Sequence, residues 1–224
     1  MSINDVVQGF TYFLAMLFAL TFHESAHAYT SHLLGDDSAK SMGRLSLNPA
    51  VHIDLVGTIV LPLVCSIFGA PFIGWAKPVP YDERNFKHPV RGAMLTAAAG
   101  PAANLLLGFV SMLFIGLNAR YHWGIFNEGS FLAPVTKLAA ALVYMNGVLA
   151  FLNLIPLPPL DGATILRAFV SRGFWERYES VIGPYGFFIF MFLAFSGGLA
   201  WISPLTMYYI RVLEVFTGFL LHSF

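Results

Sequence analysis

The sequence predicts an all-α, polytopic membrane protein with about five transmembrane helices and one re-entrant segment near residues 55–73. Three observations lead to this fold class. Of the 224 residues, 57% are hydrophobic and only 11% are charged, whereas soluble domains carry about 25% charged residues. Long apolar segments are spread from one end of the chain to the other, and one of them is broken by glycine and proline. One globule of this size cannot bury so much apolar surface, so lipid must surround part of it.

Charge and cysteine content narrow the class further. The formal net charge is zero, so nothing indicates a nucleic-acid partner. Cys65 is the only cysteine, which excludes an internal disulfide and a multi-cysteine zinc site. We therefore expect the lipid bilayer as the main surroundings of the chain, and the sequence carries no signal for an oligomeric state.

Six apolar segments are candidates for membrane helices, and a crossing helix needs about 20 apolar residues. They are 6–34, 55–73, 93–118, 132–154, 181–200 and 203–222. The first, third and fourth are long enough to cross, and the phenylalanine-rich fifth is a further candidate. The sixth carries Arg211 and Glu214, which are spaced to share one helical face. It fits either a span with a satisfied ion pair or a helix in the membrane interface.

The second segment is interrupted by Gly57, Pro62 and Pro71. We therefore expect it to enter the membrane and return to the same side, with its irregular backbone buried in protein or facing water. No internal repeat and no long linker divides the chain, so we expect one integral-membrane domain over residues 1–224.

The strongest local signal for chemistry is the run His23-Glu24-Ser25-Ala26-His27 in the first segment. Residues four positions apart share a face of a helix, so both imidazoles can bind one Zn²⁺. The glutamate between them can reach a water on that ion and act as general base. Such a pattern also arises by chance, but ionisable side chains inside an apolar segment are costly and usually functional.

A catalytic zinc ion needs a third protein ligand and an open position for water. Asp161 is the strongest candidate, because three prolines interrupt the helix just before it and make room for water or a substrate strand. Taken alone, Asp161 fits equally well as the cap of a helix that begins at Gly162.

The membrane-embedded HExxH at 23–27 and the distant N-x-x-P-x-P-x-L-D-G at 153–162 together resemble the site-two protease family of intramembrane zinc metalloproteases. Residues 99–104 resemble the family's A-G-P-x-x-N motif. The loops at 48–52 and 74–80 are similar to those of its small bacterial and archaeal members, and no PDZ or CBS domain is recognisable.

The resemblance covers about residues 8–170, which it implies to be the catalytic core, whereas the C-terminal helices expected within 181–222 match no motif of the family. It also implies roles for individual residues. These are zinc ligand for His23, His27 and Asp161, general base for Glu24, and substrate-binding region for Asn153 and Pro159.

Two further polar residues leave alternatives open. Asn104 lies in the third segment and fits either a hydrogen bond between helices or polarisation of a substrate carbonyl. His52 fits a group behind the metal ligands, a substrate contact, an alternative ligand, or a plain loop histidine that caps the following helix. The run 74–80 has strand-like residues beside prolines, and as a hypothesis it pairs with an unfolded substrate as an edge strand.

A shared zinc ion requires its three ligands to lie at one membrane depth. The ligands cannot meet if all of the first four segments cross, and they can meet if segment 55–73 returns to the side it came from. Lys and Arg concentrate in cytoplasmic loops. The arrangement in which segment 55–73 returns separates positive charge between the two sides more strongly than the arrangement in which every segment crosses. It leaves Arg120, with Lys137 near the membrane, on the opposite side. The cytoplasmic set is Lys40, Arg44, Lys77, Arg84, Lys87, Arg91, Arg167, Arg172 and Arg177. The chain is thus expected in the cell membrane, with its active site toward the cytoplasm and its N-terminus outside.

The function that follows is a zinc-dependent endopeptidase, with one catalytic Zn²⁺, that cuts transmembrane protein or peptide substrates within or next to their membrane helices. Such a reaction is typical of regulated intramembrane proteolysis, and it requires local unwinding of the substrate helix. The alternative is a membrane metal-ion transporter or metal-handling protein that uses the same His and Asp cluster. A third possibility is an inactive scaffold, which the complete ligand set argues against.

Overall fold

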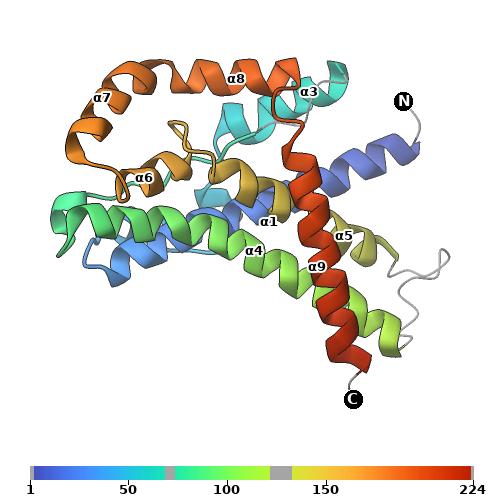
Figure 1. Cartoon of the computed structure of the whole chain (residues 1–224). Helices are drawn as coiled ribbons and strands as arrows, with labels where there is room; N and C mark the ends of the chain where they lie inside the picture. The colour runs from blue at the N-terminus through green and yellow to red at the C-terminus, as the bar shows by residue number, and fades with distance from the viewer. Residues whose placement is uncertain (1–2, 69–73, 122–132, 223–224) are drawn as a thin grey trace.

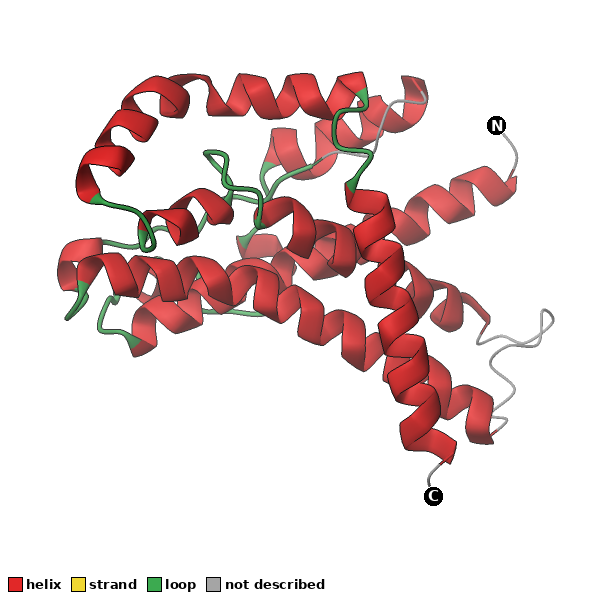
Figure 2. Ribbon diagram, viewed as in Figure 1, coloured by secondary structure: helices red, strands yellow, loops and turns green. Residues whose placement is uncertain are grey.

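The computed structural model describes residues 3–68, 74–121 and 133–222, and every regular element in these residues is a helix (Figures 1 and 2). The long helices are α1 (Ile3–Leu33), α4 (Pro89–Tyr121), α5 (Ala133–Asn153) and α9 (Ile202–His222). The shorter ones are α2 (Ser38–Ser41), α3 (Leu61–Phe68), α6 (Asp161–Arg167), α7 (Arg172–Ile182) and α8 (Gly186–Ser196). Single turns are η1 (Pro49–Val51), η3 (Glu83–Asn85), η4 (Gly183–Tyr185) and the π-helical turn η2 (Leu55–Val60).

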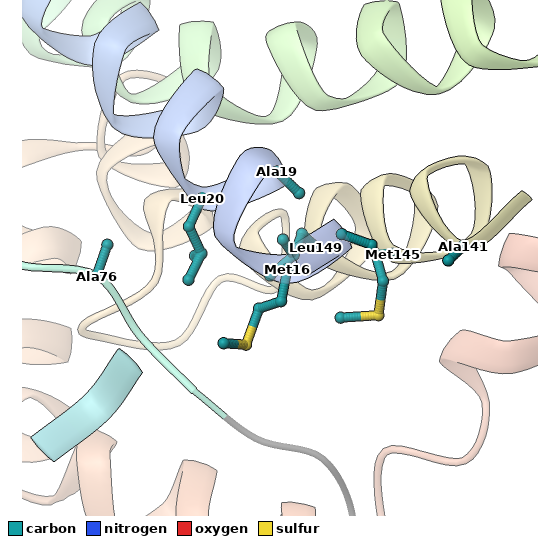
Figure 3. Packing of buried hydrophobic residues seen from close by; sticks show 8 residues of the cluster. Met16, Ala19, Leu20, Ala76, Ala141, Met145 and Leu149 are labelled. Carbon is teal, nitrogen blue, oxygen red and sulfur yellow. The ribbon is translucent and has the colours of Figure 1, made fainter. Parts of the chain in front are cut away.

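Helices α1, α4 and α5 form the centre of the fold. Small residues lie where these helices meet, among them Ala19, Ala97 and Ala150, and all three are buried. Small side chains let helix backbones approach closely, which is how membrane helices gain packing contacts without a hydrophobic driving force. Larger apolar side chains such as Met16 and Leu149 fill the space between α1 and α5 (Figure 3).

Four helical stretches of the described residues are long and apolar enough to cross a membrane. They are Val6–Leu33, Pro89–Tyr121, Ala133–Asn153 and Arg172–Ser196. The prediction of an all-α, polytopic membrane fold is therefore confirmed, with four such stretches rather than about five. The fourth stretch is bent rather than straight, because η4 separates α7 from α8 (Figure 1).

The second apolar segment turns back on itself. Its helical part, η2 followed by α3, runs from Leu55 to Phe68 and is too short to cross as one helix, which takes about 20 residues. After 69–73, which with Pro71 lie outside the described residues, the chain comes back to where it began. The Trp75 N–H donates to the Gly57 carbonyl at 3.1 Å, and Thr58 Oγ1 donates to the Trp75 carbonyl at 2.8 Å. A Cβ on Gly57 would lie 2.3 Å from the Trp75 indole, so this contact requires glycine.

Residues 74–80 are extended but form no strand with any described residue. Alternate N–H groups bond to the protein. Trp75 donates to η2, Lys77 donates to the His52 carbonyl at 2.8 Å, and Val79 donates to Glu24 Oε2 at 3.0 Å. The strand-like sequence thus forms an extended segment, and the N–H groups along one of its edges are bonded to the rest of the protein.

Helix α9 packs across α4 and α5 (Figure 1). Tyr209 Oη donates to the Leu105 carbonyl at 2.7 Å, and a Cβ on Gly108 would lie 2.3 Å from this oxygen. Within the described residues, Arg211 and Glu214 form no ion pair, so the satisfied pair that one reading of the sequence required is not found.

Candidate metal centre

Two histidines of α1 face the interior of the bundle. His23 and His27 lie one helical turn apart and are 4% and 8% exposed. Their Nε2 atoms are 3.0 Å apart, and the rings meet edge to face. The spacing of four residues produces this arrangement, because it returns the chain to the same face of the helix.

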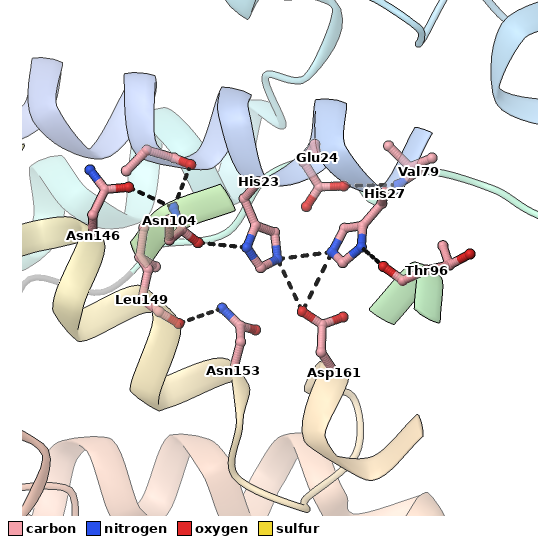
Figure 4. Close-up of polar contacts among 11 residues, drawn as sticks. His23, Glu24, His27, Val79, Thr96, Asn104, Asn146, Leu149, Asn153 and Asp161 are labelled. Atoms are coloured by element: carbon pink, nitrogen blue, oxygen red, sulfur yellow. Dashed lines mark hydrogen bonds and ion pairs between the residues drawn. The ribbon is translucent and has the colours of Figure 1, made fainter. Parts of the chain in front are cut away.

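Asp161 completes the cluster from the start of α6, far away in the sequence (Figure 4). Its Oδ2 lies 3.1 Å from His23 Nε2 and 3.4 Å from His27 Nε2. Ligands about 2.1 Å from a tetrahedral zinc ion stand roughly 3.4 Å from one another, so these separations suit one ion. Leu160 occupies the N-cap position of α6, so the alternative in which Asp161 only caps a helix does not describe this structure.

In each histidine, the hydrogen bond that Nδ1 makes determines the tautomer, and therefore whether Nε2 carries a proton where it faces the cluster. His27 Nδ1 lies 2.7 Å from the Thr96 carbonyl, which can only accept, so Nδ1 carries the proton. His23 Nδ1 lies 2.7 Å from Asn104 Oδ1 and donates to it in the same way. Each neutral ring then directs the lone pair of Nε2 inward, as metal-binding histidines do.

Three acceptors therefore converge on one point. Asp161 Oδ2 is buried and accepts no hydrogen bond, and the two Nε2 lone pairs face it without a proton between them. Such an arrangement is unfavourable unless a cation lies among the three atoms. The residues present thus fit a metal ion, and they are the only group of three or more His, Cys, Asp and Glu ligands in the described residues that does so.

Gly100 of α4 makes room for the two histidines. A Cβ at this position would lie 2.5 Å from His23 Cε1 and from His27 Nε2, which is closer than real contacts allow. The glycine of the A-G-P-x-x-N motif is therefore needed because α4 passes directly beside the imidazole rings.

Glu24 lies beside the cluster and is also buried. Its Oε2 accepts a hydrogen bond from the Val79 N–H at 3.0 Å, which fixes the carboxylate at the edge of the two histidines (Figure 4). The extended segment 74–80 thus reaches the candidate centre through its backbone.

Asn104 is fully buried and has every polar atom in use. Its Oδ1 accepts from His23, and its Nδ2 donates to the Ala19 carbonyl at 3.0 Å and to Asn146 Oδ1 at 2.8 Å. Both amide hydrogens are occupied, which favours the orienting role over polarisation of a substrate carbonyl.

The other predicted residues lie around the cluster rather than in it. Asn153 ends α5, where its Nδ2 donates to the Leu149 carbonyl at 2.9 Å, and Pro159 is exposed on the loop before Asp161. His52 is buried with its Nε2 2.8 Å from the Ser46 carbonyl, and it is not part of the three-ligand group. It therefore does not act as an alternative ligand in this arrangement.

Sequence reasoning missed three partners of the site. Two are backbone groups, the Thr96 carbonyl and the Val79 N–H, which leave no trace in residue type. The third, Asn146, could have been found as a polar residue in the middle of an apolar segment.

An ion pair between α6 and η3 helps to fix the position of α6. Arg167 Nη1 lies 2.8 and 2.9 Å from the two carboxylate oxygens of Glu83 in η3. Both side chains are about one third exposed or less. Burial, followed by the charges of Glu83 and Asp161, raises the pKa of the nearby Tyr81 phenol, so it stays protonated at neutral pH. The pair joins the helix that carries Asp161 to η3, which follows the segment 74–80 that holds Glu24.

The chain is similar to a family of peptidases and to several proteins described as zinc metalloproteases. A model of peptidase family M50 matches residues 122–193. YwhC of Bacillus subtilis, which is described as a zinc metalloprotease, is 37% identical over 180 residues, covering 80% of this chain and 78% of its own. Rip2 of Mycolicibacterium smegmatis, described in the same way, is 28% identical over 82% of this chain and 66% of its own length. Rip2 of Mycobacterium tuberculosis is 28% identical over 67% of this chain and 54% of its own. No solved structure matches the chain.

Proposed function

Because this chain belongs to peptidase family M50, the site-two proteases, we propose that it is a zinc endopeptidase that hydrolyses peptide bonds within or next to the membrane helices of its substrates. The family supports a multi-pass membrane metalloprotease that uses zinc. The observation that carries the finer proposal is the convergence of His23 Nε2, His27 Nε2 and Asp161 Oδ2 inside apolar helices. Intramembrane cleavage follows because the candidate centre is built from a helix long enough to cross the membrane.

In this proposal His23, His27 and Asp161 hold one zinc ion and leave a fourth position open for water or substrate. When bound, the ion supplies a Lewis acid that polarises the scissile carbonyl and favours deprotonation of water near neutral pH. Asn104 and the Thr96 carbonyl keep both histidines in the required tautomer and orientation.

Glu24 is the general base. Its Oε2 is held by the Val79 N–H, which orients the carboxylate beside the two ligands. Glu24 removes a proton from the attacking water and later delivers it to the nitrogen of the leaving amine. The hydrogen bond from Val79 costs no reorganisation during the reaction, because it is already formed.

The substrate helix must unwind before cleavage, since its backbone groups are otherwise paired. Trp75, Lys77 and Val79 turn their N–H groups into the protein. In an extended chain the backbone groups of the residues between them point the opposite way, and here these are the Ala76 N–H and the carbonyls of Ala76 and Pro78, since proline has no N–H. We propose that this second edge receives the extended substrate, and that Asn153 and Pro159 shape the opposite wall.

The active site lies toward the cytoplasm and the N-terminus outside in this proposal. The loops beside α6 and at the start of α4 carry most of the Lys and Arg residues. The packing of α9 on α4 and α5 supports treating residues 1–224 as one protease domain. The metal-transporter alternative is not favoured, because the relatives are described as metalloproteases.

The test is cleavage of a transmembrane peptide by purified protein in liposomes. Removal of zinc with a chelator should abolish cleavage, and stoichiometric zinc should restore it. Zinc flux across the same liposomes without any peptide cleavage would support the transporter and contradict the proposal.

A further inference from the structure

Helix α9 carries two exposed charged side chains outside the stripe that packs on the protein, with Glu214 on the flank of that stripe. Thr206, Leu213 and Thr217 are buried against the bundle, whereas Arg211 and Glu214 are exposed. The helix has 3.6 residues per turn, so Arg211 lies nearly opposite the buried stripe. The proposed catalytic chemistry uses neither residue.

The depth of these two residues makes their exposure unusual. Leu213 lies between them in the sequence and packs on Met112 of α4 and Val143 of α5. Val143 lies at the middle of α5, which is long and apolar enough to cross the membrane. Although α9 is not itself among the four stretches apolar enough to cross, this packing puts Arg211 and Glu214 level with the middle of α5, where both are exposed on the outside of the bundle.

A charge in that position is costly unless it finds a partner. Within the described residues, neither side chain forms an ion pair or a side-chain hydrogen bond, although they stand only three positions apart. The surface is also hollowed. Lining a shallow depression of about 580 Å³ are Tyr208, Arg211, Val212, Val215, Phe216 and Phe219.

We propose that this face of α9 binds α9 of a second copy of the chain. Two copies related by a twofold axis along the membrane normal present the same face to each other, with their helices parallel. Arg211 of each copy then lies about one turn from the partner's Glu214, which gives two reciprocal ion pairs. The face is self-complementary because it holds one charge of each sign, and this favours a second copy over an unrelated helix.

Gly218 supports close approach on the same face. It lies two turns beyond Arg211, and a Cβ there would meet no atom within 4 Å. Small residues at such positions let two membrane helices come near enough for polar side chains to meet. The flanking Tyr208, Val215 and Phe219 are exposed and supply apolar packing around the pairs.

Charge reversal tests this dimer directly. Two differently tagged copies are placed in phosphatidylcholine–phosphatidylglycerol liposomes, and energy transfer between fluorophores on the tags reports association. Wild-type protein should associate, and Arg211→Glu or Glu214→Arg alone should weaken association by about tenfold or more. A mixture of the two single variants should associate again, because one copy then carries two acids and the other two bases.

If Arg211 and Glu214 paired within one helix instead, mixing the two single variants would not restore association, because neither copy would regain its own pair. The matched control is Arg172→Glu, which breaks an exposed i,i+4 pair on α7 and should leave association unchanged. Zinc content reports whether each variant is folded. If reversal prevents folding, Arg211→Gln and Glu214→Gln make the same test, and each should lower energy transfer at unchanged zinc content.

Three outcomes overturn the proposal outright, and a fourth assigns the face to another partner. The three are a wild-type protein that stays monomeric at every lipid ratio, single variants that associate as wild type does, and a mixture that fails to recover. Association of wild-type protein only when a substrate peptide is present would also contradict it, because that result assigns the face to the substrate.

Discussion

Asn104 illustrates how one buried amide determines the state of a metal ligand. Its Nδ2 donates to Ala19 and Asn146, so Oδ1 is left to face His23 Nδ1. The proton of His23 is thereby held away from Asp161, and the Nε2 lone pair is free for the ion. A hydrophobic side chain at 104 would remove this control and leave Asn146 Oδ1 without its donor.

We therefore expect Asn104→Leu to lower zinc affinity by about 10- to 100-fold, the usual effect of losing a partner behind a ligand. Competition with a chelating dye measures this without any cleavage assay. Asn48→Ala, which removes an asparagine that only caps η1, is the control and should leave zinc affinity unchanged. Equal affinities for Asn104→Leu and wild type would mean that Asn104 does not orient His23.

Gly100 gives a steric prediction at the same scale. Gly100→Ala should abolish stoichiometric zinc binding and lower the melting temperature, because its Cβ would lie 2.5 Å from both imidazoles. Gly173→Ala on α7 is the matched control. Its Cβ would meet nothing within 4 Å, so it should keep full zinc content and be neutral or slightly stabilising. Full zinc content in Gly100→Ala would show that α4 does not press against the histidines.

At the scale of elements, the short helix α6 decides where the third ligand stands. It has only seven residues and no side-chain cap, so its position depends on contacts outside itself. The pairing of Arg167 with both oxygens of Glu83 ties it to η3. A disturbance of this pair should therefore reach Asp161 through the helix.

We expect Arg167→Glu and Glu83→Arg each to lower zinc affinity roughly fivefold, as the loss of an ion pair of about 1 kcal/mol would do. The double variant should recover most of the loss, because the pair is rebuilt with its charges exchanged. Arg172→Gln breaks an exposed pair of similar length and serves as the control. If the double variant loses as much zinc affinity as the two single variants together, the pair does not position α6.

Sequence patterns predicted the elements unevenly. The spacing of His23 and His27 determined their shared face, and the length of the segments beginning at 6, 93 and 132 predicted α1, α4 and α5 within a few residues. The bend between α7 and α8 was missed, because apolar length does not reveal where η4 interrupts a helix. The approach of Asp161 to α1 could be inferred only through the motif resemblance, since it depends on contacts between distant segments.

At the scale of the whole molecule, one topological fact makes the candidate centre possible. The return of the chain at Gly57 and Trp75 keeps the loops that flank α3 at one end of the bundle. The end of α1 and the start of α6 then meet there, as Figure 1 shows. A segment that crossed completely would place His27 and Asp161 at opposite ends.

Cysteine labelling tests this topology. In a Cys65→Ala background, Lys40→Cys and Arg84→Cys should react with a membrane-impermeant reagent from the same side, the cytoplasmic one, and Asn4→Cys from the other. Wild-type Cys65 is buried and should remain unreactive in folded protein. Labelling of residues 40 and 84 from opposite sides would show that the segment at 55–73 crosses.

We propose that Glu24 performs proton transfer at a zinc ion held by His23, His27 and Asp161. The most direct measurement compares wild type with Glu24→Gln for zinc content and for cleavage of a transmembrane peptide in liposomes. We predict that the variant keeps one zinc ion per chain, because Glu24 is not among the ligands. Its cleavage rate should fall by about 100-fold or more, as expected for loss of a general base. Cleavage at the wild-type rate with full zinc content would show that Glu24 is not the general base.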